Sequence, residues 1–127
     1  MQFEHVALNV PDPVAMARWY IEHCGMRVVF SIEQAPYTRF MADEGGRVVM
    51  EIYSNPMAPI PDYRAQHTLS FHIAFAEPDP AAVKERLLAA GAVLVEEQRS
   101  GDGSHLIMLR DPWGVPLQLC KRGTPLA

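Results

Sequence analysis

Apolar and polar positions follow the same order twice along the chain. Each half opens with a strand-like apolar run, has an amphipathic helical pattern, and continues with three more strand-like runs. In the first half these segments lie at 3–10, 13–24, about 26–33, about 37–43 and about 47–54. In the second half they lie at 69–76, 80–90, about 93–99, about 104–110 and about 115–121. The pattern predicts an α+β fold made of two βαβββ modules.

The two halves also share sequence. The segment His5–Ala15 aligns with His72–Ala82, and six of the eleven pairs are identical, including a Pro-Asp-Pro triplet. We therefore expect a single domain over 1–127, with one repeat at 1–54 and a second at 68–122. The connecting segment 55–67 begins with three closely spaced prolines and is expected to be an extended linker.

Each predicted helix carries start and stop signals. Asp12-Pro13 and Asp79-Pro80 place an N-cap acceptor before a proline that suits the first helical position. Gly25 and Gly91 follow the last helical residues, where glycine commonly ends a helix.

Alternation along the strands gathers four polar side chains on the less apolar faces. His5 and His72 are repeat mates, and Glu51 and Gln118 are separated by the same 67 residues. If the halves are related by a pseudo-two-fold axis, these four groups converge. Two imidazoles, one carboxylate and one amide oxygen suit a borderline divalent ion such as Zn, Ni, Mn, Co or Fe. The histidines as ordinary sheet residues, and Glu51 paired with Arg39 or Arg110, are the alternatives.

Five further residues are candidates for substrate contact. Asn9 and Tyr53 share strand faces with the predicted ligands. Arg39, Arg110 and Trp113 are candidates for contact with an anionic or aromatic substrate, with surface roles as the alternative. Pro112, Trp113 and Gly114 predict a turn between the last two strands.

Composition and charge exclude several classes of protein. The 127 residues carry a formal charge of −4, which gives no basic footprint for nucleic acid or an anionic membrane. No apolar run approaches the roughly 20 residues of a spanning helix, and no signal peptide is expected. Cys24 and Cys120 lie far apart without CxxC spacing, which favours two thiols in a cytoplasmic protein. No Gly-rich phosphate loop and no G-x-S-x-G elbow is present.

Five segments resemble the vicinal oxygen chelate superfamily, which contains glyoxalase I, fosfomycin-resistance, bleomycin-resistance and extradiol dioxygenase relatives. They are Phe3–Asp12, Trp19-Tyr20 before Gly25-Met26, Val49–Tyr53, Phe71–Phe75 and Arg110–Leu119. The resemblance implies βαβββ modules with cup-shaped mixed sheets around a metal that accepts two vicinal substrate oxygens. The family's ligand places fall on His5, Glu51, His72 and Gln118. It further implies a small-molecule substrate and a homodimer.

Two positions depart from glyoxalase I itself. Many relatives have a proton-moving Glu where this chain has Gln118, and an amide is not a base at neutral pH. Bacterial glyoxalase I-like sequences tend to have Arg where this chain has Asn9. We therefore expect a glyoxalase-like, metal-dependent lyase or isomerase, with Glu51 and Gln118 as candidate catalytic residues and with either Glu51 or a metal-bound hydroxide moving the proton. The alternatives are an Fe(II)-dependent, extradiol-type dioxygenase and a metal-free drug-binding resistance protein.

Overall fold

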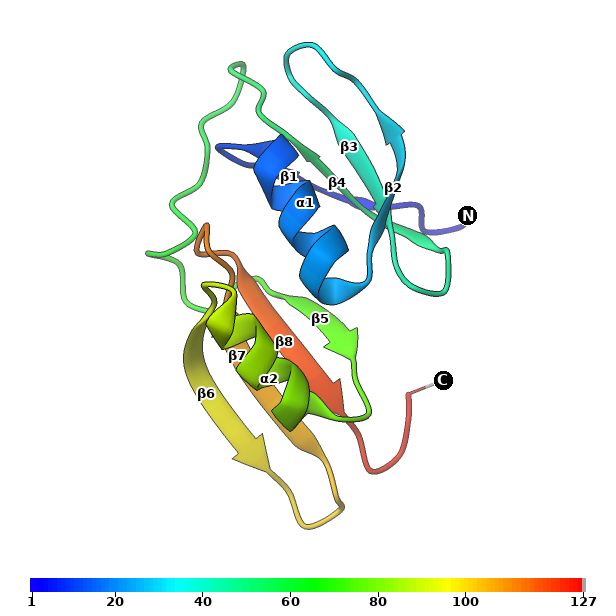
Figure 1. The fold of residues 1–127 in the computed structure, drawn as a ribbon, viewed down its shortest axis with the longest axis vertical. Coiled ribbons are helices and arrows are strands. Elements are labelled where there is room, and N and C mark those ends of the chain that lie inside the picture. The colour runs from blue at the N-terminus through cyan, green and yellow to red at the C-terminus, as the bar shows by residue number, and fades with distance from the viewer. Residues whose placement is uncertain (127) are drawn as a thin grey trace. The chain divides into compact units, whose positions relative to one another are not determined.

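The computed structural model describes residues 1–126 and contains two helices and eight strands (Figure 1). The first half contains β1 (Val6–Asn9), α1 (Pro13–Cys24), β2 (Arg27–Ser31), β3 (Arg39–Ala42) and β4 (Val48–Tyr53). The second half contains β5 (Ile73–Ala76), α2 (Pro80–Ala89), β6 (Val93–Arg99), β7 (His105–Arg110) and β8 (Pro116–Lys121). The predicted βαβββ order is confirmed in both halves.

The chain divides into two units, Met1–Pro61 and Asp62–Ala127. The sheet of the first unit has the strand order β1-β4-β3-β2, and that of the second has the order β5-β8-β7-β6. In each sheet the first strand is parallel to the last, and the other neighbours are antiparallel. Both units are therefore four-stranded mixed sheets with the same topology, which confirms the α+β class.

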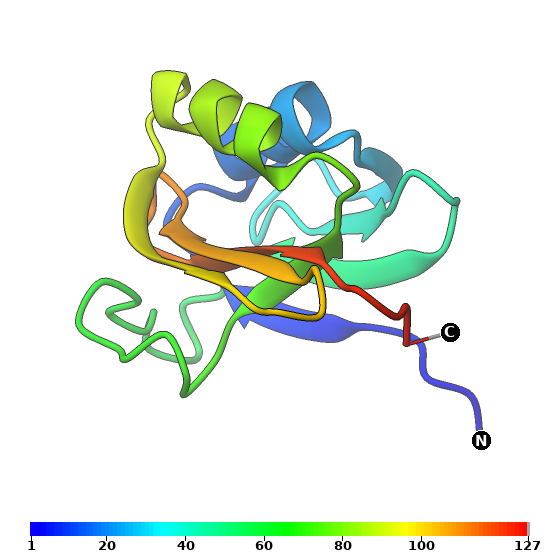
Figure 2. The ribbon, with the colours of Figure 1, turned by 90° about the horizontal axis from the view of Figure 1, so that it is seen from below.

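One face of each sheet is covered by the helix of its own unit (Figures 1 and 2). In the first unit this face carries Met50 and Ile52, which are at most 2% exposed. In the second unit it carries Leu117 and Leu119, exposed to the same small extent. Burying one such side chain contributes about 1.5–3 kcal/mol relative to leaving it in water. The apolar alternation thus fixes which face receives the helix and leaves Glu51 and Gln118 on the other face.

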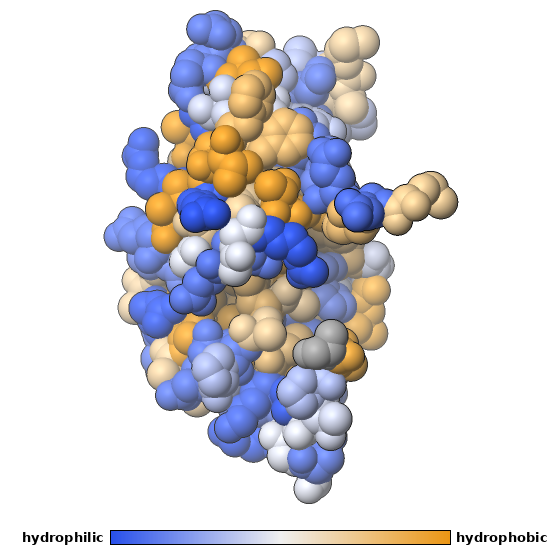
Figure 3. Space-filling model, turned by 90° about the vertical axis from the view of Figure 1, so that its right-hand side faces the viewer, coloured by the Kyte–Doolittle hydropathy of each residue, from blue (hydrophilic) through white to orange (hydrophobic). Residues whose placement is uncertain are grey.

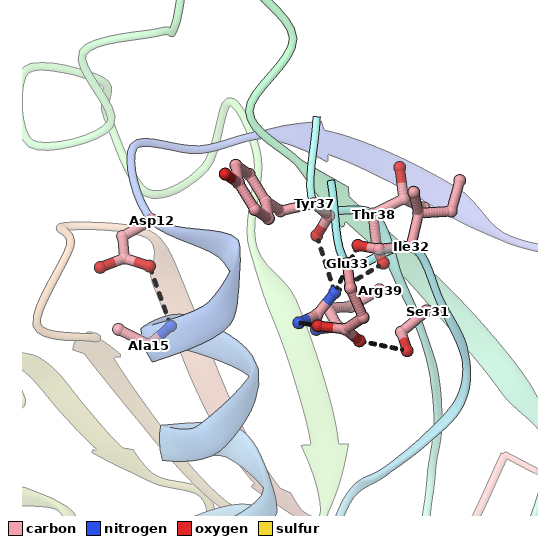
Figure 4. Close-up of polar contacts among 8 residues, drawn as sticks. All are labelled: Asp12, Ala15, Ser31, Ile32, Glu33, Tyr37, Thr38 and Arg39. Carbon is pink, nitrogen blue, oxygen red and sulfur yellow. Dashed lines mark hydrogen bonds and ion pairs between the residues drawn. The ribbon is translucent and has the colours of Figure 1, made fainter. Parts of the chain in front are cut away.

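The predicted helix starts and the predicted end of α1 have the expected geometry, whereas α2 ends at Ala89 with Ala90, not Gly91, as its C-cap. The Asp12 carboxylate accepts a hydrogen bond from the Ala15 amide at 3.0 Å (Figure 4), and Asp79 accepts one from Ala82 at 3.2 Å. Gly25 ends α1 with a φ of 66°, a left-handed conformation that glycine adopts without steric cost.

The first strand of each unit is shorter than the sequence predicted. The predicted runs began at Phe3 and Leu69, but β1 begins at Val6 and β5 at Ile73. Phe3 is 81% exposed and Leu69 is 76% exposed, so neither side chain gains the burial that would extend the strand. His5 and His72 consequently each lie immediately before a strand.

Matching turns join the last two strands of each unit. The Gly46 amide donates to the Asp43 carbonyl at 2.9 Å, and the Gly114 amide donates to the Asp111 carbonyl at the same distance. Both glycines have positive φ, 86° and 88°. The predicted turn over Pro112–Gly114 is therefore confirmed, and its counterpart over Asp43–Gly46 was not foreseen.

Within residues 1–126, no helix has the length and apolar character needed to cross a membrane.

Candidate functional site

The first unit brings His5 and Glu51 together. Ala7 of β1 lies opposite Glu51 of β4, and His5 shares the face of Ala7 because it precedes it by two residues. The His5 Nε2 atom lies 3.2 Å from the Glu51 Oε2 atom. The side chains are 27% and 18% exposed, so the pair is partly shielded from water. Within the first unit, the structure places His5 beside Glu51, while Arg39 lies opposite Ile52 on the other face of the sheet.

A second carboxylate lies on the other side of the His5 ring. The Nδ1 atom is 3.0 Å from the Glu4 Oε1 atom. A neutral imidazole carries one N–H, so one of its two nitrogens presents a lone pair to a carboxylate. That arrangement is unfavourable unless a proton or another cation lies between the lone pair and the oxygen.

The second unit has His72 and Gln118 at the equivalent register. Ala74 of β5 lies opposite Gln118 of β8, and His72 precedes Ala74 by two residues. The His72 Nδ1 atom is 3.0 Å from the Thr68 carbonyl oxygen. An Nδ1–H donated to this carbonyl leaves the Nε2 lone pair available, which is the arrangement usual for a metal-ligating histidine.

Gln118 has a sulfur neighbour on its own strand. The Cys120 thiol donates to the Gln118 Oε1 atom at 3.1 Å, and Cys120 is 8% exposed. Burial raises the pKa of the Cys120 thiol, so the thiolate form that attacks electrophiles or binds metal is disfavoured. Cys120 therefore orients the amide rather than adding a reactive group.

Each unit thus contributes one pair of the predicted ligands. Among residues 1–126, no three His, Cys, Asp or Glu side chains form a group that could hold a metal. The convergence of all four residues on one ion stays a prediction.

The donor chemistry of the two pairs fits a divalent ion. Nitrogen and oxygen ligands each about 2.0–2.2 Å from one ion lie about 3 Å apart, and the His5–Glu51 separation is 3.2 Å. Gln118 and His72 supply an amide oxygen and an imidazole nitrogen.

Asn9 and Tyr53 flank the pair of the first unit. Tyr53 lies two residues beyond Glu51 on the same face and is partly exposed. Asn9 uses its amide on the following linker: Nδ2 donates to the Asn55 and Ala58 carbonyls, both at 3.0 Å, and Oδ1 accepts from the Asn55 amide at 2.8 Å. Asn9 thereby holds the proline-rich segment, a role that the sequence had not indicated.

Arg39 lies on the opposite face of its sheet from Glu51. It is opposite Ile52 in the β3–β4 register and is 7% exposed. Its guanidinium donates to the carbonyls of Ile32, Tyr37 and Thr38 and to the Glu33 carboxylate at 3.0 Å (Figure 4). The guanidinium thus holds the β2–β3 connection together, and its hydrogen bonds indicate a structural role rather than contact with a substrate.

Arg110 has the same kind of role in the second unit. It donates to the carbonyls of Tyr63, Gln66 and Gly114 at 2.7–3.1 Å. Trp113 lies in the adjacent turn, where its amide donates to the Asp111 carboxylate at 2.9 Å. These contacts stabilise the segment before β5 and the turn before β8.

Two aromatic residues that the sequence had not singled out lie beside the His5–Glu51 pair. Phe40 of β3 lies opposite Glu51, and Phe30 of β2 lies opposite Phe40. The His5 and Phe40 rings meet edge to face at 5.2 Å between centroids, and the Phe40 and Phe30 rings are 6.1 Å apart. Alternation around Arg39 and Met41 would have placed Phe40 on this face. The register that adds Phe30 includes a bulge between Val28 and Phe30, which alternation does not reveal.

Comparison with known proteins agrees with this architecture. Residues 2–119 match the family model of the Glyoxalase/Bleomycin resistance protein/Dioxygenase superfamily. The chain belongs to this superfamily. The superfamily includes metalloenzymes and antibiotic-binding proteins, so membership narrows the function without choosing between these two classes. No curated protein matched the sequence.

Solved structures of the superfamily share the fold at low identity. A glyoxalase family protein from Bacillus cereus has a TM-score of 0.75 and 17% identity, with 96% of this chain and 94% of that chain covered. The fosfomycin resistance protein FosX from Listeria monocytogenes, in complex with Mn(II) and 1S,2S-dihydroxypropylphosphonic acid, has a TM-score of 0.72 and 19% identity, with 98% and 91% covered. TnmS3, an antibiotic binding protein from Streptomyces sp. CB03234, has a TM-score of 0.69 and 16% identity, with 96% of each chain covered.

Proposed function

We propose that this superfamily member is a metal-dependent lyase or isomerase acting on a small oxygenated substrate. The observation that carries the proposal is the His5–Glu51 pair, whose Nε2 and Oε2 atoms face each other at 3.2 Å on the face away from α1. His72 and Gln118, at the equivalent register of the second unit, complete the proposed ligand set.

The ion would supply Lewis-acid polarisation of an oxygen on the substrate, which makes a neighbouring C–H easier to deprotonate. FosX was crystallised with Mn(II), which supports a divalent ion in this fold. Among Ni, Zn, Mn, Co and Fe, the nitrogen and oxygen donors of this chain do not select one.

The histidines bind through the nitrogen that their other hydrogen bonds leave available. The Thr68 carbonyl accepts from His72 Nδ1, and the Glu4 carboxylate accepts from His5 Nδ1, so both rings would hold the ion through Nε2. Gln118 binds through its amide oxygen and stays neutral.

Glu51 is the proposed base. It is the one ionisable oxygen donor of the four residues, and Gln118 cannot accept a proton at neutral pH. Its side chain is 18% exposed, which limits competition from water for the carboxylate. Glu51 would therefore both hold the ion and accept the proton.

Solvent exchange tests the proton transfer directly. We expect the metal-loaded protein in D2O to exchange a C–H proton next to the carbonyl in at least one member of a panel of hydroxyketones and hemithioacetals, followed by proton NMR. Glu51→Gln should abolish this exchange, because the amide accepts no proton. His67→Ala is the matched control, since His67 is an exposed histidine outside the ligand set. Equal exchange in Glu51→Gln and wild type would refute the role of Glu51.

The drug-binding class gives a different result in the same experiment. A protein of that class would bind its ligand equally well after chelation and would exchange no proton. TnmS3 shows that the fold serves antibiotic binding. Metal-independent binding without exchange would therefore replace the proposed enzyme with a binding protein.

We further propose a homodimer in the cytoplasm that binds neither nucleic acid nor membrane. Sedimentation equilibrium tests the assembly: the chain mass is 14.2 kDa, and a dimer should sediment with twice that mass.

A further inference from the structure

The face that carries Glu51 continues into aromatic side chains. Strand register places Ala7, Glu51, Phe40 and Phe30 in one row across β1, β4, β3 and β2. A ligand held at the His5–Glu51 pair would therefore have the phenyl rings of Phe40 and Phe30 beside it on the side toward β3 and β2.

Ring contacts make the row continuous. His5 contacts Phe40 edge to face at 5.2 Å, and Phe40 and Phe30 are tilted at 57° with centroids 6.1 Å apart. These are ordinary separations for favourable aromatic pairs. The imidazole that faces Glu51 thus also touches the first of the two phenyl rings.

Phe30 retains exposed surface that a ligand can cover. It is 57% exposed, and its neighbours Val29 and Ile32 are 47% and 37% exposed. Figure 3 shows apolar side chains gathered on the surface of the first unit. Exposed apolar clusters of this kind commonly mark binding surfaces.

The second unit has no aromatic residue in the corresponding row. There Ala74, Gln118, Met108 and Glu96 take the four places, so a buried thioether and an exposed carboxylate replace the two phenyl rings. An apolar group of a ligand would therefore pack against aromatic rings only in the row of the first unit. In that row it would extend from Glu51 toward Phe40 and Phe30.

We infer that Phe40 and Phe30 determine specificity by binding an aryl or similarly flat apolar group of a ligand whose oxygen atoms bind beside His5 and Glu51. The inference rests on the proposed function for the oxygen-binding end. For the aryl end of the ligand, the inference rests on the row of aromatic rings and does not depend on any catalytic step.

Two hydroxamates allow the contribution of the aryl end of the ligand to be measured separately from that of its oxygen-binding end. Acetohydroxamate and benzohydroxamate present the same pair of vicinal oxygens, and only the second carries a phenyl ring. Titration calorimetry of each against the Zn(II)-loaded protein should give about tenfold tighter binding of benzohydroxamate, the size of effect that one well-placed ring provides. In Phe30→Leu/Phe40→Leu this ratio should fall to about twofold, with acetohydroxamate affinity unchanged.

Val95→Ala is the control for the loss of an exposed apolar side chain elsewhere, since Val95 is 45% exposed in the second unit. It should keep the tenfold ratio. A ratio that is unchanged in the double phenylalanine variant would overturn the inference, as would equal binding of the two hydroxamates to the wild type.

Failure of the proposed function gives a distinguishable result. If chelation with EDTA leaves the affinities unaltered and the aryl preference still depends on Phe30 and Phe40, the aromatic row stands and the metal end is wrong. If both hydroxamates bind only with Zn(II) and without aryl preference, the metal end stands and the aromatic row is wrong.

Discussion

The two units have the same fold and carry different chemistry on the same face. In the first unit the residue opposite Ala7 is the carboxylate Glu51, followed across the sheet by Phe40 and Phe30. In the second unit the residue opposite Ala74 is the amide Gln118. A duplicated topology thus fixes where side chains lie, while the carboxylate opposite the first strand and the aromatic row belong to the first unit.

The second unit has a network of charged and polar side chains on its other face, beside the helix. Glu97 of β6 accepts from His105 of β7 at 2.7 Å and from Lys84 of α2 at 3.0 Å. Ile107 lies opposite Glu97, which places this network on the same face as the apolar core. The network ties the edge strand β6 to α2 and β7, so its role is to hold an otherwise exposed strand in place.

The largest predicted effect comes from moving the carboxylate between the units. Glu51→Gln should weaken Zn(II) binding about 100-fold, because removing a direct ligand costs at least as much as removing the groups that orient one. The exchanged variant Glu51→Gln/Gln118→Glu should recover binding to within about tenfold of wild type, since the two positions are equivalent in register. Competition titration with a chromogenic chelator measures both. An exchanged variant as weak as Glu51→Gln alone would contradict the equivalence.

Substituting alanine for each of the two matching turn glycines should lower the free energy of unfolding by different amounts in the two units. A Cβ at Gly114 would lie 2.3 Å from the Arg64 Cγ and 3.0 Å from the Arg64 backbone nitrogen. A Cβ at Gly46 would meet the flexible end of Arg27 at 2.9 Å. Both substitutions carry the cost of a left-handed conformation, so we expect losses of about 1 kcal/mol for Gly46→Ala and about 2–4 kcal/mol for Gly114→Ala.

Urea unfolding followed by circular dichroism measures the two losses. Equal losses would show that the close approach of Arg64 does not add to the backbone cost.

The two carbonyl-binding arginines should affect stability and leave metal binding unchanged. Arg39→Met and Arg110→Met each remove the donor from three backbone carbonyls, for an expected loss of about 1–3 kcal/mol. Zn(II) affinity measured on the folded variants should stay within about twofold of wild type, because the hydrogen bonds of each guanidinium go to groups outside the ligand pairs of its own unit. A tenfold loss of metal affinity in Arg39→Met would show that Arg39 supports the metal site.

The smallest predicted effect is a pH dependence of the charged network in the second unit. The hydrogen bond from His105, followed by that from Lys84, lowers the pKa of Glu97 below its ordinary value of 4.5. A carboxyl group whose pKa is lower in the folded protein stabilises the fold fully above about pH 4.5, and this contribution is lost as the pH falls through the folded pKa. Glu97→Gln should therefore flatten the dependence of the unfolding midpoint on pH below 4.5.

Glu85→Gln is the matched control, because Glu85 also lies near Lys84, at 3.6 Å, and its side chain is 73% exposed. Its acid dependence should follow wild type. The same slope in Glu97→Gln and wild type would show that the network contributes no acid sensitivity.

The sequence predicted the parts of this molecule that depend on local pattern. Helix starts at Asp12 and Asp79 follow from local hydrogen bonding, and the faces of Glu51 and Gln118 follow from strand alternation. The repeat predicted that the two modules share one topology. These features need few long-range contacts to be specified.

Features set by tertiary packing were not predictable in the same way. Nothing in the sequence indicates that Arg39 and Arg110 each bind three carbonyls, because those carbonyls come from loops folded back on the strands. The late strand starts at Val6 and Ile73 accompany the exposure of Phe3 and Leu69, and the sequence does not show that these apolar side chains stay exposed. The bulge in β2 likewise hides the alignment of Phe30 with Phe40.

The central claim is that one ion takes ligands from both units, and metal stoichiometry tests it most directly. Elemental analysis after incubation with Zn(II), Ni(II) or Mn(II) and gel filtration should give one ion per chain in wild type and in His67→Ala. His5→Ala and His72→Ala should each lose the ion, although the two histidines belong to different units. Full occupancy in either variant, or no metal in wild type with any of the three ions, would contradict the account.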